Sequence, residues 1–83
     1  DLTAKWREFG WNAIEVDGHD IKAVIGAYQQ AKFCKEKPTV LIANTVKGKG
    51  VSFMENDCNW HGSVPNEDQL HQALAELGLE GTR

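Results

Sequence analysis

The chain has 83 residues, of which 41% are hydrophobic, 25% charged and 8% aromatic, and its formal net charge is −3. This composition is typical of a soluble globular domain, and no apolar run approaches the ~20 residues of a membrane span. The charge pattern lacks the basic stripe of a nucleic-acid-binding protein, so we expect neither nucleic acid nor membrane as a partner.

The two cysteines, Cys34 and Cys58, are too few for a disulfide scaffold. Cys34 has no evident partner and is expected to be a reduced thiol, which fits a cytoplasmic protein. No signal peptide is visible. Because the sequence opens on Asp1 rather than methionine, we expect a processed or truncated piece of a longer protein.

Residues 2–9 are predicted to form a helix, because large apolar side chains recur on one face. These side chains are Leu2, Trp6 and Phe9. Gly10 is the expected stop. Residues 11–16 alternate in part between apolar and polar and suit a short strand, which leads into a turn at residues 17–20.

A second helix is predicted over residues 20–36. Asp20 is a suitable N-cap, and Pro38 forbids continuation of the helix. Lys35 and Lys37 close its C-terminal end, where the helix dipole favours cations. The expected apolar face consists of Ile21, Val24, Ile25, Tyr28 and Ala31.

A second strand is predicted over residues 39–46, which are rich in β-branched types. Its run Val40–Ala43 is continuously apolar, as expected for a strand covered on both faces. Residues 51–65 are predicted to form a long loop. A structureless loop of this length is unusual inside a domain and often functional.

A last helix follows the loop. Asn66 is the expected N-cap, and Gln69, three residues later, completes a variant of the capping box. The apolar stripe consists of Leu70, Ala73, Leu74 and Leu77. Gly78 is the expected stop.

The predicted order is therefore α-β-α-β-loop-α. A strand, a crossover helix and a strand imply two parallel strands with a right-handed connection. Parallel sheets occur almost only with both faces covered and further strands alongside. We therefore predict a fragment of a doubly wound parallel α/β sheet, whose strands pair with residues outside this chain.

Two polar loops follow the predicted strands, at residues 17–20 and 47–50. Parallel strands would bring both loops to one edge of the sheet, where ligands bind in open α/β folds. The second loop, Lys47-Gly48-Lys49-Gly50, is a candidate anion site, because lysines pair with phosphate and glycines let a backbone approach it. It is not a P-loop, which has a different spacing. A flexible loop with solvated lysines is the alternative.

His61 lies in the long loop and is followed by Gly62. A histidine titrates near neutral pH and can move protons or bind phosphate, and the glycine would allow a tight turn that aims the imidazole. A lone surface histidine is the alternative. Cys58 and His61, with Asp57 adjacent, have a metal-ligand spacing, but no second pair completes a zinc set. Other polar residues are interpreted as turn, cap or solvated residues: Asp17, His19, Asp20 and His71.

Five motifs occur in a fixed order along nearly the whole chain. They are Trp6–Trp11, Glu15–Asp20, Lys37–Thr39, Thr45–Glu55 and Trp60–Gly62. Together they resemble the C-terminal part of the thiamine-diphosphate-binding domain of transketolases, most closely those with a separate N-terminal subunit. Deoxyxylulose-phosphate synthases share the Asp-Gly-His-Asp turn and the Lys-Gly-Lys-Gly-like loop, whereas Val-Ser-Phe-Met-Glu and Trp-His-Gly are more similar to transketolases.

The resemblance implies an aldehyde–ketose transferase. Such an enzyme moves a two-carbon ketol unit from a ketose phosphate to an aldose phosphate in the pentose phosphate pathway, using thiamine diphosphate and Mg²⁺. It also implies that His61 is catalytic and lies beside the cofactor diphosphate, that Lys47 pairs with the diphosphate, and that Gly48 and Gly50 shape the loop.

The same resemblance indicates what these residues lack. The family's metal-binding signature begins Gly-Asp-Gly, which occurs nowhere in the chain. We therefore expect residues 1–83 to be an incomplete, C-terminal portion of the domain, with the upstream part and the metal ligands elsewhere. A partner pyrimidine-binding domain or subunit supplies the activating glutamate in the family, so a homodimer or a two-plus-two assembly is expected. The fragment alone is expected to be inactive.

Three alternatives remain open at this point. One is a related thiamine-diphosphate enzyme, such as a deoxyxylulose-phosphate synthase or a transketolase-like enzyme for another sugar phosphate. The second is a non-catalytic assembly module that retains the fold. The third is a phosphate- or nucleotide-binding half-domain that uses the Lys-Gly-Lys-Gly loop.

Overall fold

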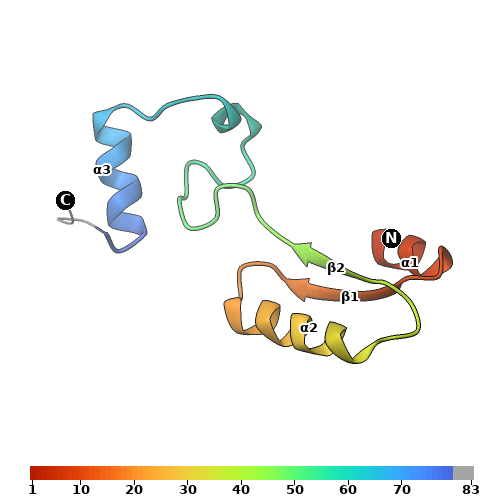
Figure 1. The fold of residues 1–83 in the computed structure, drawn as a ribbon. Helices are drawn as coiled ribbons and strands as arrows, with labels where there is room; N and C mark the ends of the chain where they lie inside the picture. Colours follow the sequence, from red (N-terminus) through yellow and green to blue (C-terminus); the bar gives the residue numbers. More distant parts are fainter. Residues whose placement is uncertain (80–83) are drawn as a thin grey trace. The chain divides into compact units, whose positions relative to one another are not determined.

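Helices and strands alternate along residues 1–79, the part of the chain that the computed structural model describes. In chain order they are α1 (Leu2–Glu8), β1 (Asn12–Asp17), α2 (Ile21–Phe33), β2 (Thr39–Asn44), the 3₁₀ helix η1 (Cys58–His61) and α3 (Glu67–Glu76) (Figure 1). The predicted order is confirmed, with η1 added inside the long loop. The chain divides into two units between Thr45 and Val46, and each is described by itself.

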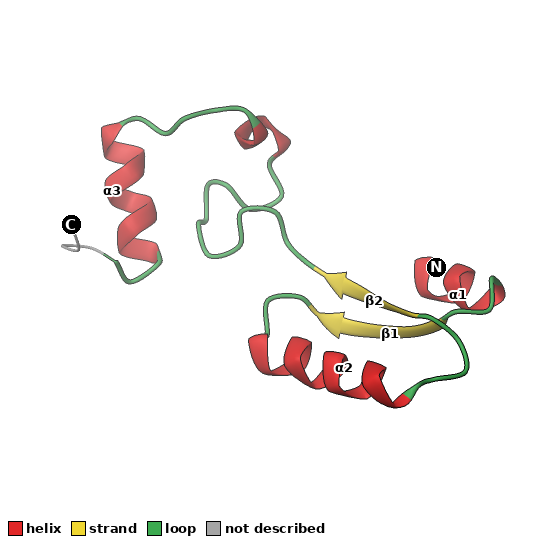
Figure 2. Cartoon of the chain, in the orientation of Figure 1, coloured by secondary structure: helices red, strands yellow, loops and turns green. Residues whose placement is uncertain are grey.

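β1 and β2 form a parallel pair, as predicted (Figure 2). The register runs without a bulge from Asn12 opposite Thr39 to Asp17 opposite Asn44. At the far end of the pair, the Gly18 N–H donates to the Asn44 carbonyl over 2.8 Å. Among the described residues this sheet has two strands.

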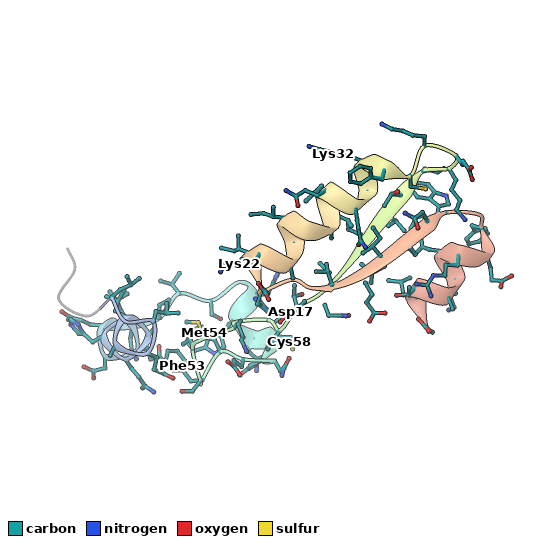
Figure 3. The ribbon with its side chains drawn as sticks, turned by 90° about the horizontal axis from the view of Figure 1, so that it is seen from below. Asp17, Lys22, Lys32, Phe53, Met54 and Cys58 are labelled. Carbon is teal, nitrogen blue, oxygen red and sulfur yellow. The ribbon has the colours of Figure 1, made fainter. Side chains whose placement is uncertain are left out.

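The two helices of the first unit lie on opposite faces of this strand pair, as Figures 1 and 3 show. On the α1 face, the Thr3 hydroxyl donates to a Glu15 carboxylate oxygen over 2.9 Å. On the other face, Ile14 of β1 lies beside Phe33 of α2. Neighbouring strand residues point to opposite faces, which accounts for the split between Ile14 and Glu15. The strands of this α/β fragment are thus covered on both sides, but only in part.

α2 ends earlier than predicted. Its N-cap is Asp20, whose carboxylate accepts from the Ala23 N–H over 3.2 Å, as expected. Its last residue is Phe33, because Cys34 is extended (φ −88°, ψ 102°). The prediction of a helix to residue 36 was wrong, since the chain turns there toward β2.

The apolar face predicted for α2 is largely uncovered. Ile21 and Tyr28 are 76% and 60% exposed, whereas Ala27, which was not assigned to that face, is 4% exposed. Phe9, predicted to share the apolar face of the first helix, is 82% exposed. These side chains therefore do not build a core within the described residues.

The long loop is not structureless, which corrects the prediction for residues 51–65. Turns occupy much of its first part, and η1 follows. α3 then begins at the predicted capping box: the Asn66 side chain accepts from the Gln69 N–H over 2.8 Å, and the Gln69 side chain accepts from the Asn66 N–H over 2.9 Å. Gly78 has φ +74° and ends the helix, as predicted.

The buried apolar side chains are small. They are Ala13, Ala27, Val51 and Ala73, and no large side chain in residues 1–79 is fully buried. Within the same residues, no helix is long and apolar enough to cross a bilayer.

Candidate functional site

The loop that begins at Lys47 closes on itself. The Asn56 N–H donates to the Lys47 carbonyl over 2.9 Å, and the Met54 N–H donates to the Val51 carbonyl over 2.9 Å. A Glu55 carboxylate oxygen accepts from the Gly50 N–H over 3.1 Å. The second unit therefore holds the lysine–glycine segment in a closed turn, which argues against the flexible-loop alternative.

Gly48 is required at the tightest point of this turn. Its φ is +70°, and a Cβ placed on it would lie 2.6 Å from the carbonyl carbon and oxygen of Met54. Both the backbone conformation and the close approach exclude a side chain there. Gly48 thus shapes this loop, as the sequence predicts.

The short helix η1 carries His61 and is held at two points. A carboxylate oxygen of its N-cap, Asp57, accepts from the Asn59 N–H over 3.0 Å. The Trp60 indole N–H donates to the Phe53 carbonyl over 3.0 Å, and the Trp60 and Phe53 rings meet edge to face with centroids 5.3 Å apart. These contacts join η1 to the preceding loop.

A cavity of about 280 Å³ lies between the closed loop and η1. It is lined by Lys47, Gly48, Met54, Asp57, Cys58, Trp60 and His61. Met54 and Cys58 are labelled in Figure 3 together with Phe53, all in the second unit. The structure therefore brings together the three predicted site residues, Lys47, Gly48 and His61, although thirteen positions separate Gly48 from His61.

The prediction about Gly62 was wrong. This glycine has φ −122°, a conformation open to any residue, and a Cβ placed on it would meet nothing within 4 Å among the described atoms. The imidazole of His61 is therefore not aimed by a glycine turn. The backbone conformation of His61 is instead that of the 3₁₀ helix η1, of which it is the last residue.

Sequence reasoning missed part of the cavity wall. Met54 and Trp60 line the cavity, but the sequence gives them no role beyond the family motifs, and it connects Asp57 only with a metal-ligand spacing. The signal for Asp57 was present, because an aspartate immediately before a short helical turn is a typical N-cap. Within residues 1–79, no group of three or more His, Cys, Asp or Glu side chains is placed to hold a metal ion.

The first predicted loop is structural. The Asp17 carboxylate accepts from the His19 N–H over 2.9 Å, and Asp20 caps α2. Both aspartates are turn and cap residues, as interpreted from the sequence. This loop and the Lys47 loop belong to different units, so their convergence at one edge stays a prediction.

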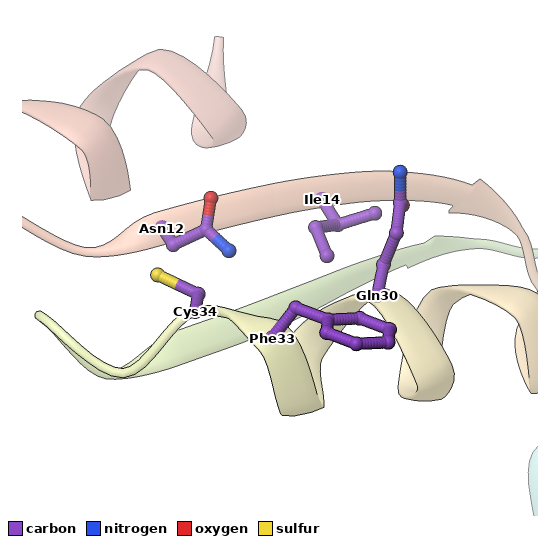
Figure 4. A pocket seen from close by; sticks show the side chains of 5 residues that line it. All are labelled: Asn12, Ile14, Gln30, Phe33 and Cys34. Atoms are coloured by element: carbon purple, nitrogen blue, oxygen red, sulfur yellow. The ribbon is translucent and has the colours of Figure 1, made fainter.

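A second cavity, of about 310 Å³, lies in the first unit between β1 and the end of α2. Asn12, Ile14, Gln30, Phe33 and Cys34 line it, and Figure 4 shows these five side chains. It has no charged side chain in its lining, so it offers no counter-charge to an anionic ligand. The Lys47 cavity is the better candidate site.

Two carboxylates outside both cavities have lowered pKa values. Hydrogen bonds from Asn44 and Thr3, in that order of importance, hold the pKa of Glu15 below its ordinary range. The Asn44 amide donates to Glu15 over 2.8 Å. Hydrogen bonds from the side chain of Ser52 and then from its N–H, which donates over 3.0 Å, likewise lower the pKa of Glu76 and tie α3 to the loop of the second unit.

The Lys47 cavity fits an anionic group. An ammonium and an imidazole line it together with one carboxylate, that of Asp57, and the absence of a side chain at Gly48 brings backbone to its edge. Fold and site together define an α/β fragment with a cavity suited to phosphate. The residues present thus fit the diphosphate end of a cofactor.

Comparisons with known proteins identify the family. The sequence model for the transketolase thiamine diphosphate binding domain matches residues 1–83. The chain is 41% identical over 80 residues to the 6-deoxy-6-sulfo-D-fructose transketolase subunit SqwG of Clostridium sp. (strain MSTE9), covering 96% of this chain and 29% of that protein. It is 37% identical over 73 residues to an apulose-4-phosphate transketolase subunit of Phocaeicola vulgatus, covering 88% and 26%.

A longer relative is human transketolase, with 39% identity over 69 residues, or 83% of this chain and 11% of that protein. The chain therefore spans less than a third of each of these relatives. It belongs to the family of transketolase thiamine diphosphate-binding domains.

Proposed function

We propose that residues 1–83 are the C-terminal portion of the thiamine-diphosphate-binding domain of a transketolase. The complete enzyme would transfer a two-carbon ketol unit from a ketose phosphate to an aldose phosphate. One observation carries this proposal: Lys47, Gly48 and His61 line one cavity in a chain of this family. Thiamine diphosphate, when bound, supplies the carbanion chemistry.

The chain's own residues would bind and orient. The Lys47 ammonium would pair with the diphosphate, because a phosphate group binds a cation in a charge-assisted contact. Gly48 would let the loop backbone approach it. His61 would donate a hydrogen bond to the oxygen of the donor ketose or to the phosphate side, where charge develops. Met54 and Trp60 would form the apolar wall that excludes water.

Other parts would come from outside these residues. The Mg²⁺ ligands are proposed to lie in the remaining part of the domain, and a pyrimidine-binding domain or subunit would complete the site. A homodimer or a two-plus-two assembly in the cytoplasm is proposed. Two relatives are named as transketolase subunits, which supports a division of the enzyme between chains.

The sugar need not be a common pentose phosphate. Relatives that match 88–96% of this chain are named for 6-deoxy-6-sulfo-D-fructose and for apulose-4-phosphate. This favours a second candidate, a transketolase for a modified or branched sugar.

Single substitutions in the complete enzyme test the site. His61→Ala should lower kcat/KM by about 100-fold, the typical loss of one donor that stabilises developing charge. Lys47→Ala should weaken cofactor binding about tenfold, as expected for a lost charge-assisted contact. Steady-state kinetics and cofactor titrations measure both effects, and melting temperatures should change little.

Matched controls are present in the same unit. His71 on α3 and Lys49 in the same loop do not line the cavity, so His71→Ala and Lys49→Ala should leave both measurements near wild type. If His61→Ala lowers the melting temperature and leaves the rate unchanged, the proposed site is wrong.

A further inference from the structure

Among the described residues, the imidazole of His61 is positioned by the backbone of η1 and not by hydrogen bonds of its own. Within residues 1–79 no hydrogen bond to the imidazole of His61 is present. The side chain is exposed and lines the cavity only because η1 presents it there. The orientation of His61 therefore follows the orientation of η1.

η1 is too short to be stable by itself. It has four residues, and an isolated turn of 3₁₀ helix gains little from its own hydrogen bonds. Asp57 binds it twice: the carboxylate accepts from the Asn59 N–H over 3.0 Å, and the backbone carbonyl accepts from the Trp60 N–H over 3.3 Å. Asp57 also lines the same cavity as His61.

We propose that Asp57 is a positioning residue for His61. Its carboxylate caps η1 and so fixes where the imidazole enters the cavity. The contribution is geometric, not electrostatic, because a negative charge among Lys47 and His61 opposes the binding of an anion. The proposal rests on the proposed function only for its effect on the cofactor.

Two substitutions at Asp57 separate the cap from the charge. Asp57→Asn keeps an N-cap side chain and removes the charge, whereas Asp57→Glu keeps the charge and loses the favoured cap. Asp57→Ala removes both. In the complete enzyme, Asp57→Ala and Asp57→Glu should raise the thiamine diphosphate concentration for half-saturation about fivefold, the factor for a typical N-cap. Asp57→Asn should stay within about twofold of wild type.

Nuclear magnetic resonance of the histidine rings tests the geometry without any assay of activity. In Asp57→Ala and Asp57→Glu the ring signals of His61 should move or broaden, while those of His71 stay in place. Asp57→Asn should preserve both sets. Asp20→Ala is the matched control, because Asp20 caps α2 in the same way outside the cavity.

A double-mutant cycle completes the test. If Asp57 acts through His61, Asp57→Ala should add little to the cofactor effect of His61→Ala. Three outcomes would overturn the proposal. The effects of Asp57→Ala and His61→Ala on cofactor binding could be fully additive, or the ring signals of His61 could stay unchanged in Asp57→Ala. Alternatively, Asp57→Glu could bind the cofactor like wild type while Asp57→Asn binds it more weakly. A moved His61 signal together with a neutral His61→Ala would uphold the positioning and reject the proposed function.

Discussion

Gly48 fixes the wall of the candidate site through its backbone. Its positive φ of +70° and the Met54 carbonyl, 2.6 Å from a Cβ placed on Gly48, leave no room for alanine. Gly48→Ala should lower the free energy of unfolding by about 2 kcal/mol or more, from a left-handed conformation plus a steric clash. Thermal unfolding of the complete protein measures this loss, and weaker cofactor binding should accompany it.

Gly62→Ala is the natural comparison for Gly48→Ala. Gly62 has an ordinary φ of −122° and an open surrounding among the described atoms. Its replacement should leave the melting temperature within about 1 °C of wild type, since surface changes usually have small effects. Equal losses at both glycines would contradict the account of the loop.

The lowered pKa of Glu15 predicts that the stability of the folded chain depends on pH. Its lowered pKa means that the ionised form stabilises the folded chain above the pKa of the unfolded state. That contribution is lost as the pH falls through the folded pKa. Melting temperatures measured between about pH 6 and pH 3 should therefore fall less steeply in Glu15→Gln than in wild type. Glu8→Gln on α1, which removes a carboxylate and leaves the hydrogen bonds of Glu15 intact, is the control.

At single positions, lysines and glycines in one loop predict an anion site. The structure places Lys47, Gly48 and His61 in the lining of one cavity, and their role toward an anion stays a prediction. The prediction of a tight glycine turn failed at Gly62, because its backbone conformation (φ −122°) is open to any residue. Asp57 has the residue type of an N-cap, but periodicity does not predict a helix as short as η1, so the sequence connects Asp57 only with a metal-ligand spacing.

At the scale of elements, α3 has the clearest local signals. Its capping box satisfies two backbone N–H donors at once, through the side chains of Asn66 and Gln69. Asn66→Ala should lower the free energy of unfolding by about 1 kcal/mol. Amide hydrogen exchange should accelerate first in the opening turn of α3. His71→Ala, on the exposed side of the same helix, serves as the control, and a similar acceleration there would contradict the cap's role.

Element boundaries were harder to predict than element types. Pro38 and the lysines before it indicated a helix to residue 36, but Cys34 already leaves the helical conformation. The reason is tertiary: the chain must reach Thr39 to pair with Asn12. The apolar face of α2 was also misassigned: Ala27 is buried and Tyr28 is exposed, and periodicity alone does not tell which apolar side of a helix faces the sheet.

At the scale of the whole molecule, the exposed apolar surface bears on whether residues 1–83 are active by themselves. Among residues 1–79, ten large apolar side chains are at least 45% exposed, whereas the buried ones are three alanines and a valine. Within residues 1–79 the sheet has two strands, and the rest of the site is proposed to lie outside this chain. Residues 1–83 by themselves should show no transketolase turnover with thiamine diphosphate and Mg²⁺ in a coupled assay. Turnover without any other chain would refute the proposed domain assignment.

The fold class was predictable because the two-stranded parallel pair follows from strand, helix, strand. For the same reason the sequence predicts that further residues cover this pair, since parallel pairs are not stable alone. The division into two units was not predicted, because the strand expected over residues 39–46 runs across the boundary between Thr45 and Val46, whereas β2 ends at Asn44.

The small size of the buried side chains also has a consequence for the life of the protein in a cell. Within residues 1–79, Phe9, Tyr28 and Phe33 are 82%, 60% and 85% exposed. Apolar groups of this kind attract chaperones and mark a chain for proteolysis while they stay uncovered. Residues 1–83 expressed by themselves should therefore be short-lived in a cell, which a chase of protein levels after synthesis is stopped would measure.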